Sequence, residues 1–136
     1  MESMTVAVHK SDTGSLPYRL FVPPNVAKDT EVPLVLFLHG AGERGTDNRR
    51  QLRHGVSDFV SADAQANHPC ILVAPQCPRG EYWPQGNNLE LCFELIEELQ
   101  PQHPIHAHRI YITGLSMGGY GTWYALAKRP DLFAAA

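Results

Sequence analysis

The most informative pattern in the chain lies at residues 109–123, which read RIYITGLSMGGYGTW. It begins as a β-branched and apolar run, which favours a strand. It then turns at Gly114-Leu115-Ser116-Met117-Gly118 and continues with helix formers as far as Lys128. The pattern predicts a strand, a sharp turn and a helix, with a G-x-S-x-G pentapeptide at the bend.

The two glycines of this pentapeptide indicate a turn too tight for side chains, which holds the serine at a strained bend with its hydroxyl clear of the backbone. The amide N–H of Met117 is expected at the start of the helix, where an oxyanion is stabilised. A catalytic nucleophile is the preferred interpretation of Ser116, and a plain glycine-rich turn is the alternative. A phosphate-binding loop would need G-x-x-x-x-G-K-[ST], and no lysine follows these glycines before Lys128.

The composition of the 136 residues limits the class of protein. Apolar residues make up 43% and charged residues 18%, which is enough to bury the core of a single domain. The net charge of −3 comes without a basic stripe, which argues against nucleic acid as a partner. No apolar run approaches the ~20 residues of a membrane span, and no signal-peptide pattern begins the chain. We therefore expect a cytoplasmic protein with reduced thiols at Cys70, Cys77 and Cys92.

Four further segments have strand patterns. Residues 5–9 alternate weakly and predict an edge strand, and residues 16–22 predict its hairpin partner. Residues 32–38 and 70–74 are apolar at nearly every position. Continuous hydrophobicity on a short strand indicates burial on both faces, as in a central parallel strand. The sequence thus predicts an α/β fold with a mostly parallel sheet.

The loop from His39 to Asn48 follows the first buried strand and contains three glycines. Such a loop can turn its backbone N–H groups toward one point, and we assign a second oxyanion donor to the N–H of Ala41. His39 could be a catalytic base, but a histidine at the end of a strand more often braces the loop through hydrogen bonds. Asp47 or Asn48 is expected to cap a helical segment over residues 49–54.

The loop after the second buried strand lies where open parallel sheets bind ligands, outside the carboxyl ends of the strands. Gln76, Tyr82 and Trp83 are therefore candidates for lining a pocket. Ordinary aromatic anchoring of a long loop explains them equally well, and both interpretations stay open. Nothing cationic in the sequence marks Cys77 for a lowered pKa, so this thiol is not expected to be a nucleophile.

Two more helices are predicted beside the one that follows the serine. Apolar residues at helical spacing predict a helix over residues 56–66. Asn87 or Asn88 is expected to cap another helix through Gln100, whose apolar residues fall on one face. The glutamates of that helix are interpreted as a solvated face rather than as a metal site or general acid.

Three histidines between the second predicted helix and the strand before Ser116 suggest zinc at first sight. His103, His106 and His108 lie in a proline-containing connector, with no thiolate or carboxylate at ligand spacing. Zinc is therefore not expected, and the sequence implies neither a metal nor an organic cofactor.

Together these segments resemble the α/β-hydrolase superfamily, and within it the dienelactone-hydrolase-like and phospholipase/carboxylesterase-like proteins. The matching segments are LPYRL at 16–20, FLHGAGERG at 37–45, APQCP at 74–78 and GLSMGGYGTW at 114–123. The resemblance covers residues 16–136 and is more specific for the superfamily than for the subgroup. It implies acyl transfer to water through an acyl-serine intermediate, with a small-molecule ester as substrate.

Within this resemblance, each functional role falls on a residue that matches the motif. Ser116 matches the nucleophile, and Ala41 and Met117 match the positions whose backbone N–H groups form the oxyanion hole. Substrate contacts are expected from Gly40, Gln76, Trp83 and Tyr120.

The chain departs from the family after the nucleophile. In this fold the catalytic residues follow one another along the chain as serine, acid and histidine. After Ser116, the only carboxylate side chain is that of Asp131, and there is no histidine. Residues 132–136 look like the start of another strand. We therefore expect residues 1–136 to be a single domain that is incomplete at its C-terminal side, with self-association or a complementing C-terminal segment at the exposed sheet edge.

The leading interpretation is a carboxylic ester hydrolase whose acid and base are absent from this chain. The alternative is a non-catalytic binding or assembly subunit that keeps the fold.

Overall fold

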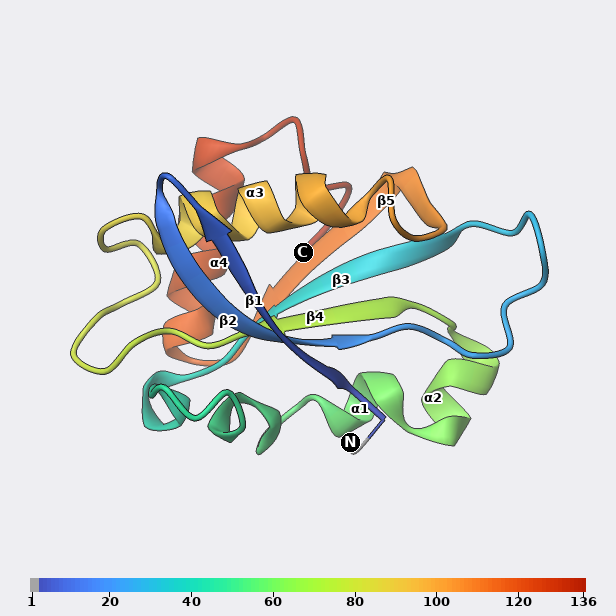
Figure 1. The fold of residues 1–136 in the computed structure, drawn as a ribbon, viewed down its shortest axis with the longest axis horizontal. Helices are drawn as coiled ribbons and strands as arrows, with labels where there is room; N and C mark the ends of the chain where they lie inside the picture. The colour runs from blue at the N-terminus through green and yellow to red at the C-terminus, as the bar shows by residue number, and fades with distance from the viewer. Residues whose placement is uncertain (1–2) are drawn as a thin grey trace.

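A computed structural model of the protein describes residues 3–136, which form a five-stranded sheet with helices on both faces (Figure 1). The strands lie in the order β1-β2-β4-β3-β5. Their bounds are β1 Thr5–Ser11, β2 Gly14–Phe21, β3 Val32–Leu38, β4 Ile71–Pro75 and β5 Ile105–Gly114. Strands β4, β3 and β5 are parallel, whereas β1 and β2 form a hairpin whose second strand pairs antiparallel with β4. The predicted α/β class with a mostly parallel core is confirmed.

The apolar central strands are buried on both faces because each face of the sheet has its own core. Along β3, Leu34, Leu36 and Leu38 point into one core, and Val35 and Phe37 point into the other. This alternation follows from the two-residue period of a strand. A strand with helices on both sides needs apolar residues at every position, which explains why the run from Val32 to Leu38 has almost no polar residue.

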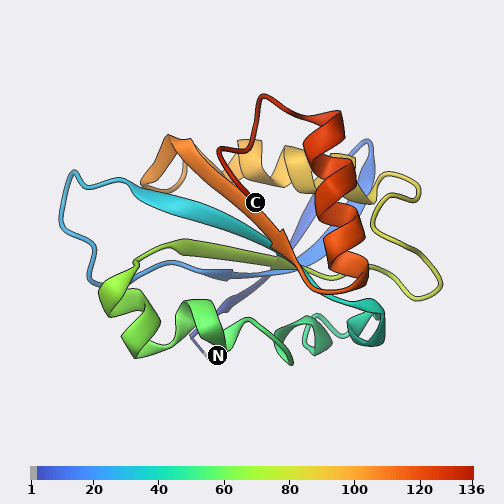
Figure 2. The same cartoon turned by 180° about the vertical axis from the view of Figure 1, so that it is seen from behind.

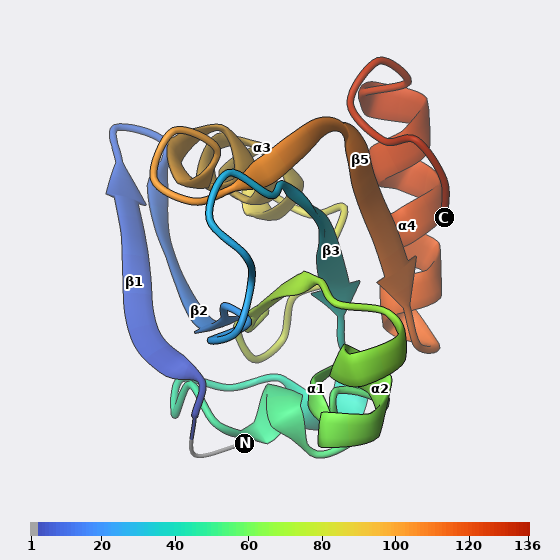
Figure 3. The ribbon, with the colours of Figure 1, turned by 90° about the vertical axis from the view of Figure 1, so that its right-hand side faces the viewer.

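Two helices cover one face and shorter segments cover the other (Figures 1, 2 and 3). The longer helices are α3 (Asn88–Leu99) and α4 (Met117–Lys128), and the opposite face carries α1 (Ser57–Val60), α2 (Ala62–Asn67) and the 3₁₀ turns η1 (Ala41–Glu43) and η2 (Arg50–Leu52). The apolar face of α3 is buried as predicted. Full burial of one leucine contributes about 1.5–3 kcal/mol, so α3 is held mainly by this face.

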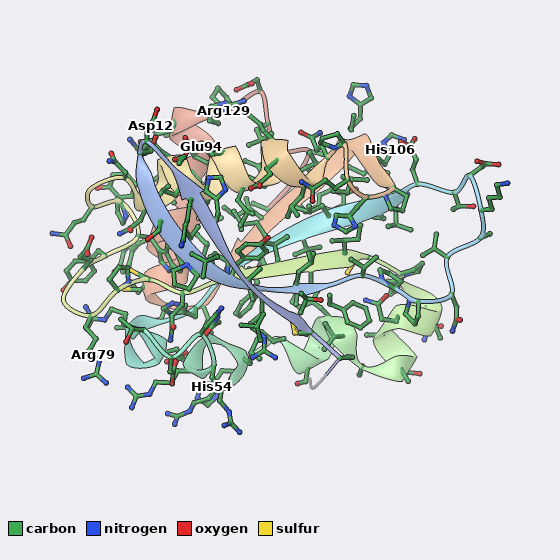
Figure 4. All side chains as sticks on the ribbon, viewed as in Figure 1. Asp12, His54, Arg79, Glu94, His106 and Arg129 are labelled. Carbon is green, nitrogen blue, oxygen red and sulfur yellow. The ribbon has the colours of Figure 1, made fainter. Side chains whose placement is uncertain are left out.

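The glutamates of α3 do more than face solvent. Figure 4 shows Glu94 close to Asp12 at the β1–β2 turn, and Thr13 Oγ1 donates a hydrogen bond to Glu94 at 2.9 Å. His9 Nδ1 contacts Glu98 at 2.6 Å. Lys128 Nζ contacts Glu90 at 3.0 Å. These contacts fasten the outer side of α3 to the hairpin and to α4.

Two helix predictions need correction. The single helix expected over residues 56–66 is instead α1 and α2, separated at Ser61, whose φ of −60° and ψ of 154° are extended. The Ser61 hydroxyl accepts the N–H of Ala64 at 3.2 Å, so this serine caps the second helix instead of continuing the first. Asn87 occupies the N-cap position of α3, but its side chain donates to Thr13 O and caps nothing.

The segment after α4 returns to the sheet beside β5, as the strand-like pattern of residues 132–136 predicts. The N–H of Ala134 donates to Ile110 O at 2.8 Å, and the N–H of Ile112 donates to Ala135 O at 3.2 Å. Tyr111 and Ala135 form a parallel bridge. Over the described residues, no helix is both long and apolar enough to cross a membrane.

Candidate active site

Ser116 occupies a strained corner between β5 and α4. Its φ of 56° and ψ of −111° lie outside the regions that non-glycine residues normally adopt, and it is the N-cap of α4. Such a conformation costs of the order of 1–3 kcal/mol and persists only where the surroundings impose it. The Ser116 side chain is exposed and donates no hydrogen bond to any described residue. The predicted strand, sharp turn and helix are therefore present in this order.

The glycines of the pentapeptide are required by close backbone contacts. A Cβ at Gly114 would lie 2.0 Å from the carbonyl oxygen of Gly118. A Cβ at Gly118 would lie 1.8 Å from the carbonyl oxygen of Leu38. Neither neighbour can move aside, because both are main-chain atoms of the turn and of the central strand. The strained serine is thus fixed by the close packing of α4 on β3.

The loop after β3 lies beside the serine. Around the position of a Cβ on Gly40, the nearest atoms are Leu115 O at 3.4 Å and, slightly farther out, Ser116 Cβ at 3.7 Å. The N–H of Leu115 donates to Leu38 O at 3.1 Å, which joins the end of β3 to the turn. The structure therefore brings together Gly40 and Ser116, two of the predicted site residues from distant parts of the chain.

Two backbone donors in this region have no acceptor. Among residues 3–136, neither the N–H of Ala41 nor the N–H of Met117 donates a hydrogen bond. Met117 is the first residue of α4, where the helix dipole places partial positive charge. Ala41 is the first residue of η1, directly after Gly40. Unpaired amides beside an exposed hydroxyl can donate hydrogen bonds to an anionic oxygen.

His39 braces the loop and is unsuited to be a base. Its Nε2 accepts the N–H of Cys77 at 2.9 Å, and its Nδ1 donates to Gly40 O at 2.6 Å. Both ring nitrogens are therefore occupied by backbone groups, and the imidazole is neutral with its proton on Nδ1. Burial holds its pKa below the ordinary value, although the bond to Gly40 acts in the opposite direction. The bracing interpretation of His39 is confirmed.

Gln76 and Trp83 are fully buried, and their polar atoms bind other parts of the protein. Gln76 Oε1 accepts the N–H of Asn48 at 2.7 Å, while its Nε2 donates to Asp47 Oδ1 at 2.8 Å. Trp83 Nε1 donates to His39 O at 3.0 Å. These contacts give both side chains a bracing role behind the site. Their predicted contact with substrate stays a prediction.

Tyr120 and Tyr82 are exposed, in contrast to the two buried candidates. Tyr120 is 70% exposed in the first turn of α4, and its N–H donates to Ser116 O at 3.2 Å. The Tyr82 ring lies under the guanidinium of Arg44, 5.7 Å from its centre. Tyr120 is therefore close in the chain to the serine and free to contact a ligand, whereas Tyr82 anchors its loop.

Arg49 is the N-cap residue of η2 and its side chain makes no cap, so the expected cap at Asp47 or Asn48 needs correction. The Asp47 carboxylate contacts this turn nonetheless. Its Oδ1 accepts the N–H groups of Arg49 and Arg50, each at 3.1 Å. The hydrogen bond from Gln76, together with these amides, lowers the pKa of Asp47 to about 2. Burial raises the pKa of Cys77 to about 12, which keeps this thiol protonated and supports its exclusion as a nucleophile.

The remaining histidines do not complete a site. Figure 4 shows His106 at the start of β5, at the opposite end of the sheet from Arg79 in the loop after β4. Within residues 3–136, no group of three or more histidine, cysteine, aspartate or glutamate side chains could hold a metal ion. In the same residues, no imidazole forms a hydrogen bond with Ser116.

Glu43, which follows Ala41 and Gly42 in the glycine-rich loop, was not among the predicted site residues. A charged residue in such a loop is normally solvated, but Glu43 is only 8% exposed. Its Oε1 lies 3.5 Å from the position of a Cβ on Gly40. The only available signal was its place between two glycines directly after a buried strand.

Comparisons with known proteins agree with this fold. Residues 80–136 match the prolyl oligopeptidase family. A solved structure of a thermostable esterase is 43% identical, with a TM-score of 0.91 over 98% of this chain and 40% of that chain. Poly(3-hydroxyalkanoate) depolymerase C of Paucimonas lemoignei is 27% identical over 124 residues, which cover 76% of this chain and 26% of the depolymerase.

More distant structures share the fold alone. An acetyl xylan esterase from Aspergillus awamori is 20% identical with a TM-score of 0.74, over 98% of this chain and 50% of that chain. The chain thus spans well under two thirds of the length of each of these relatives. With its parallel core, its strained serine turn and its 43% identity to an esterase over 98% of its own length, the chain has the α/β-hydrolase fold and resembles the esterases that share it.

Proposed function

We propose that this chain supplies the nucleophile and the oxyanion hole of a serine hydrolase that cleaves carboxylic esters. The observation that carries the proposal is the strained Ser116 beside the unpaired N–H groups of Ala41 and Met117. Its 43% identity to an esterase favours esters as the substrate class. The same geometry could attack an amide, and the match of residues 80–136 to the prolyl oligopeptidase family makes a peptide bond the second candidate.

The proposed reaction has two steps. Ser116 Oγ attacks the carbonyl carbon and gives up its proton to a base, and the carbonyl oxygen becomes an oxyanion between the two N–H groups. Collapse of this intermediate breaks the bond to the alcohol, which leaves with a proton, and an acyl-serine remains. Water then attacks the acyl-serine in the same way and releases the acid.

The base and the acid that orients it are proposed to come from polypeptide outside these 136 residues. Within the described part of the chain, Ser116 has no imidazole partner, and His39 is occupied on both nitrogens. Loss of these partners costs several orders of magnitude in rate, while binding and the oxyanion hole retain part of the catalysis. Slow acylation of Ser116 with little turnover is therefore expected of the chain by itself.

Acylation can be measured directly with p-nitrophenyl acetate. We expect the chain to release p-nitrophenol and to gain one acetyl group on Ser116, detected by intact mass and peptide mapping. Ser116→Ala should reduce the release by about tenfold or more and abolish the adduct. Ser57→Ala, which removes an exposed hydroxyl on α1, is the control and should change neither. Equal release and labelling in Ser116→Ala would remove Ser116 from the mechanism.

We also propose that the chain associates with itself or with a complementing segment. Trp123 is 75% exposed on α4, and Tyr120 and Tyr124 are exposed on the same helix. Helix α4 lies next to β5, the last strand of the sheet (Figure 2). Exposed apolar side chains that lie together on one helix favour association. Sedimentation velocity should show concentration-dependent association that Trp123→Glu weakens; a monomer at high concentration would contradict the proposal.

A further inference from the structure

The Arg44 side chain joins the loop after β3 to the loop after β4. Its Nε donates to Ala41 O at 2.9 Å, and its Nη1 donates to Glu81 O at 3.1 Å. The same guanidinium lies over the Tyr82 ring. Because the guanidinium is planar, contacts along its edge and on its face restrict it to one orientation. Arg44 is therefore a fixed link between two loops and not a mobile surface cation.

The far end of this link is anchored on α3. Asn88 is buried in the first turn of that helix, and its Nδ2 donates to Tyr82 O at 3.1 Å and to Glu81 Oε1 at 3.3 Å. Cys77 Sγ contacts the same carbonyl oxygen of Glu81 at 3.6 Å. The carbonyl that accepts the Arg44 side chain therefore belongs to a segment that is fastened to the body of the protein.

Hydrogen bonds, rather than packing, hold the turn that carries Ala41. Ala41 and Gly42 are exposed, and a Cβ on Gly42 would have no neighbour within 4 Å. The carbonyl before Ala41 is held firmly, because it accepts His39 Nδ1 at 2.6 Å and the N–H of Glu43 at 3.2 Å. In a trans peptide the N–H points away from the carbonyl oxygen. These two bonds therefore direct the N–H of Ala41 to the opposite side, where no described residue accepts it.

Arg44 holds the peptide on the other side of Ala41. Ala41 O accepts the side-chain Nε of Arg44 at 2.9 Å and the backbone N–H of the same residue at 3.4 Å. The backbone bond is long for an N–H donor, whereas the side-chain bond has an ordinary length and a charged donor. The peptides before and after Ala41 are thus both held, and the Arg44 side chain supplies the stronger bond to the second peptide.

We propose that Arg44 is a positioning residue that keeps the N–H of Ala41 directed toward the oxyanion formed at Ser116. The inference rests on the proposed function of Ser116 and Ala41. Arg44 acts through the Ala41 carbonyl, because its guanidinium is occupied by that oxygen and by the loop after β4. An oxyanion hole accelerates acylation if its donors are held in place before the charge develops. Loss of the Arg44 side chain keeps the donor but releases the turn that directs it.

Stoichiometric acylation of Ser116 by p-nitrophenyl acetate tests the proposal without catalytic turnover. Intact mass gives the rate at which the chain gains an acetyl group, and Ser116→Ala gives the background. Arg44→Ala should slow acylation by about tenfold or more, because a misplaced donor loses part of the roughly 10²-fold effect of an oxyanion-hole group. Arg44→Lys keeps the charge but loses the planar pair of donors, so it should recover part of the rate. Arg79→Ala, which removes an exposed arginine from the loop after β4 (Figure 4), is the matched control and should change nothing.

Two further measurements separate positioning from a general loss of stability. The NMR order parameters of the Ala41 and Gly42 amides should fall from about 0.85 to below about 0.6 in Arg44→Ala, while those of β3 and β5 stay unchanged. Methylguanidinium, which replaces the lost donors, should restore part of the acylation rate in Arg44→Ala and leave the unmodified chain unaffected. Slower acylation with unchanged order parameters at Ala41, or with lower order parameters throughout the sheet, would overturn the proposal.

The order parameters also separate this inference from the proposed nucleophile, because they do not depend on acylation. Labelling of Ser116→Ala at the rate of the unmodified chain would remove the nucleophile, and lower order parameters at Ala41 in Arg44→Ala would still support the hold of Arg44 on the turn. If Ser116→Ala abolishes labelling while Arg44→Ala changes neither the acylation rate nor the order parameters, the role of Arg44 is overturned and the serine chemistry stands.

Discussion

Two groups of polar atoms at the carboxyl ends of the parallel strands are used in opposite ways. In the bracing group, His39, Asp47 and Gln76 place their polar atoms in hydrogen bonds with neighbouring loops. Around the turn, the amides of Ala41 and Met117 have no partner within the described residues. The first group resembles the interior of any stable protein, whereas the two amides of the second group begin helical segments and are free to donate to a ligand.

The difference shows how the fold holds a reactive corner in place. The backbone of Ser116 is strained, so its conformation remains only if the surrounding structure leaves no alternative. His39 connects the end of β3 to Cys77, and Trp83 binds the His39 carbonyl from the loop that follows. His39 and Trp83, whose polar atoms are all hydrogen-bonded, therefore fix the loop that carries Ala41. Close packing of Gly118 on Leu38 fixes the turn that carries Met117.

The largest expected effect comes from breaking the packing of the turn. In Gly118→Ala, the new Cβ would lie 1.8 Å from Leu38 O, a main-chain atom of the central strand. Helix α4 must move away from β3 or the turn must unfold. We expect a loss of about 4 kcal/mol or more in the free energy of unfolding, measured by urea denaturation, or no folded protein at all.

Gly119→Ala is the matched control for this variant. Gly119 is the next residue of α4, and a Cβ there would have its nearest neighbour at an ordinary 3.8 Å. Alanine is the better helix former, so we expect a gain of roughly 0.5–1 kcal/mol. If the two variants were equally stable, close approach of α4 to β3 could not be what fixes the turn.

Several parts of the fold could be predicted from the sequence alone, and others could not. The strands were predictable because β3 and β4 are short and continuously apolar, and the turn was predictable because only glycine tolerates its backbone contacts. The broken helix was not, because apolar residues keep helical spacing across Ser61 while its hydroxyl caps the next segment. A serine hydroxyl that binds a backbone N–H can end one helix and begin another, and the spacing of apolar residues does not reveal this.

The candidate site was predictable for backbone groups and less so for side chains. Ser116, Ala41 and Met117 follow from turn chemistry, which is local in sequence. The buried positions of Gln76 and Glu43 depend on contacts with segments about thirty residues away, as the 3.1 Å bond between them shows. No pattern within either loop contains that information.

The second effect sharpens the role of the bracing group. His39→Gln keeps one polar group near Cys77 but loses the bond to Gly40 and the packing of the imidazole on Trp83, whose ring centre lies 5.0 Å away. We expect a loss of about 2–3 kcal/mol in the free energy of unfolding. Acylation of Ser116 should slow but not vanish, because the imidazole positions the loop and takes no proton. Complete loss of acylation in a folded variant would contradict this.

The pH dependence of stability follows from the same histidine. Burial lowers the folded-state pKa of His39 below 6.5, its ordinary value, so the unfolded chain binds the proton more readily. The stabilisation is therefore fully present above about pH 6.5 and is lost as the pH falls toward the folded-state pKa. Urea denaturation at a series of pH values should show this slope in the wild-type chain. His39→Gln should reduce the slope, and an unchanged slope would assign it to another group.

The smallest effect isolates the strain at the serine itself. Ser116→Gly removes the conflict between a Cβ and a φ of 56°, whereas Ser116→Ala removes the hydroxyl but keeps the Cβ. The difference between the two variants therefore measures backbone strain without any contribution from the hydroxyl. We expect the glycine variant to be about 1–2 kcal/mol more stable than the alanine variant by urea denaturation, and neither should be acylated. Equal stability would mean that the turn stores no strain, and the close packing of Gly118 on Leu38 alone would then fix the position of residue 116.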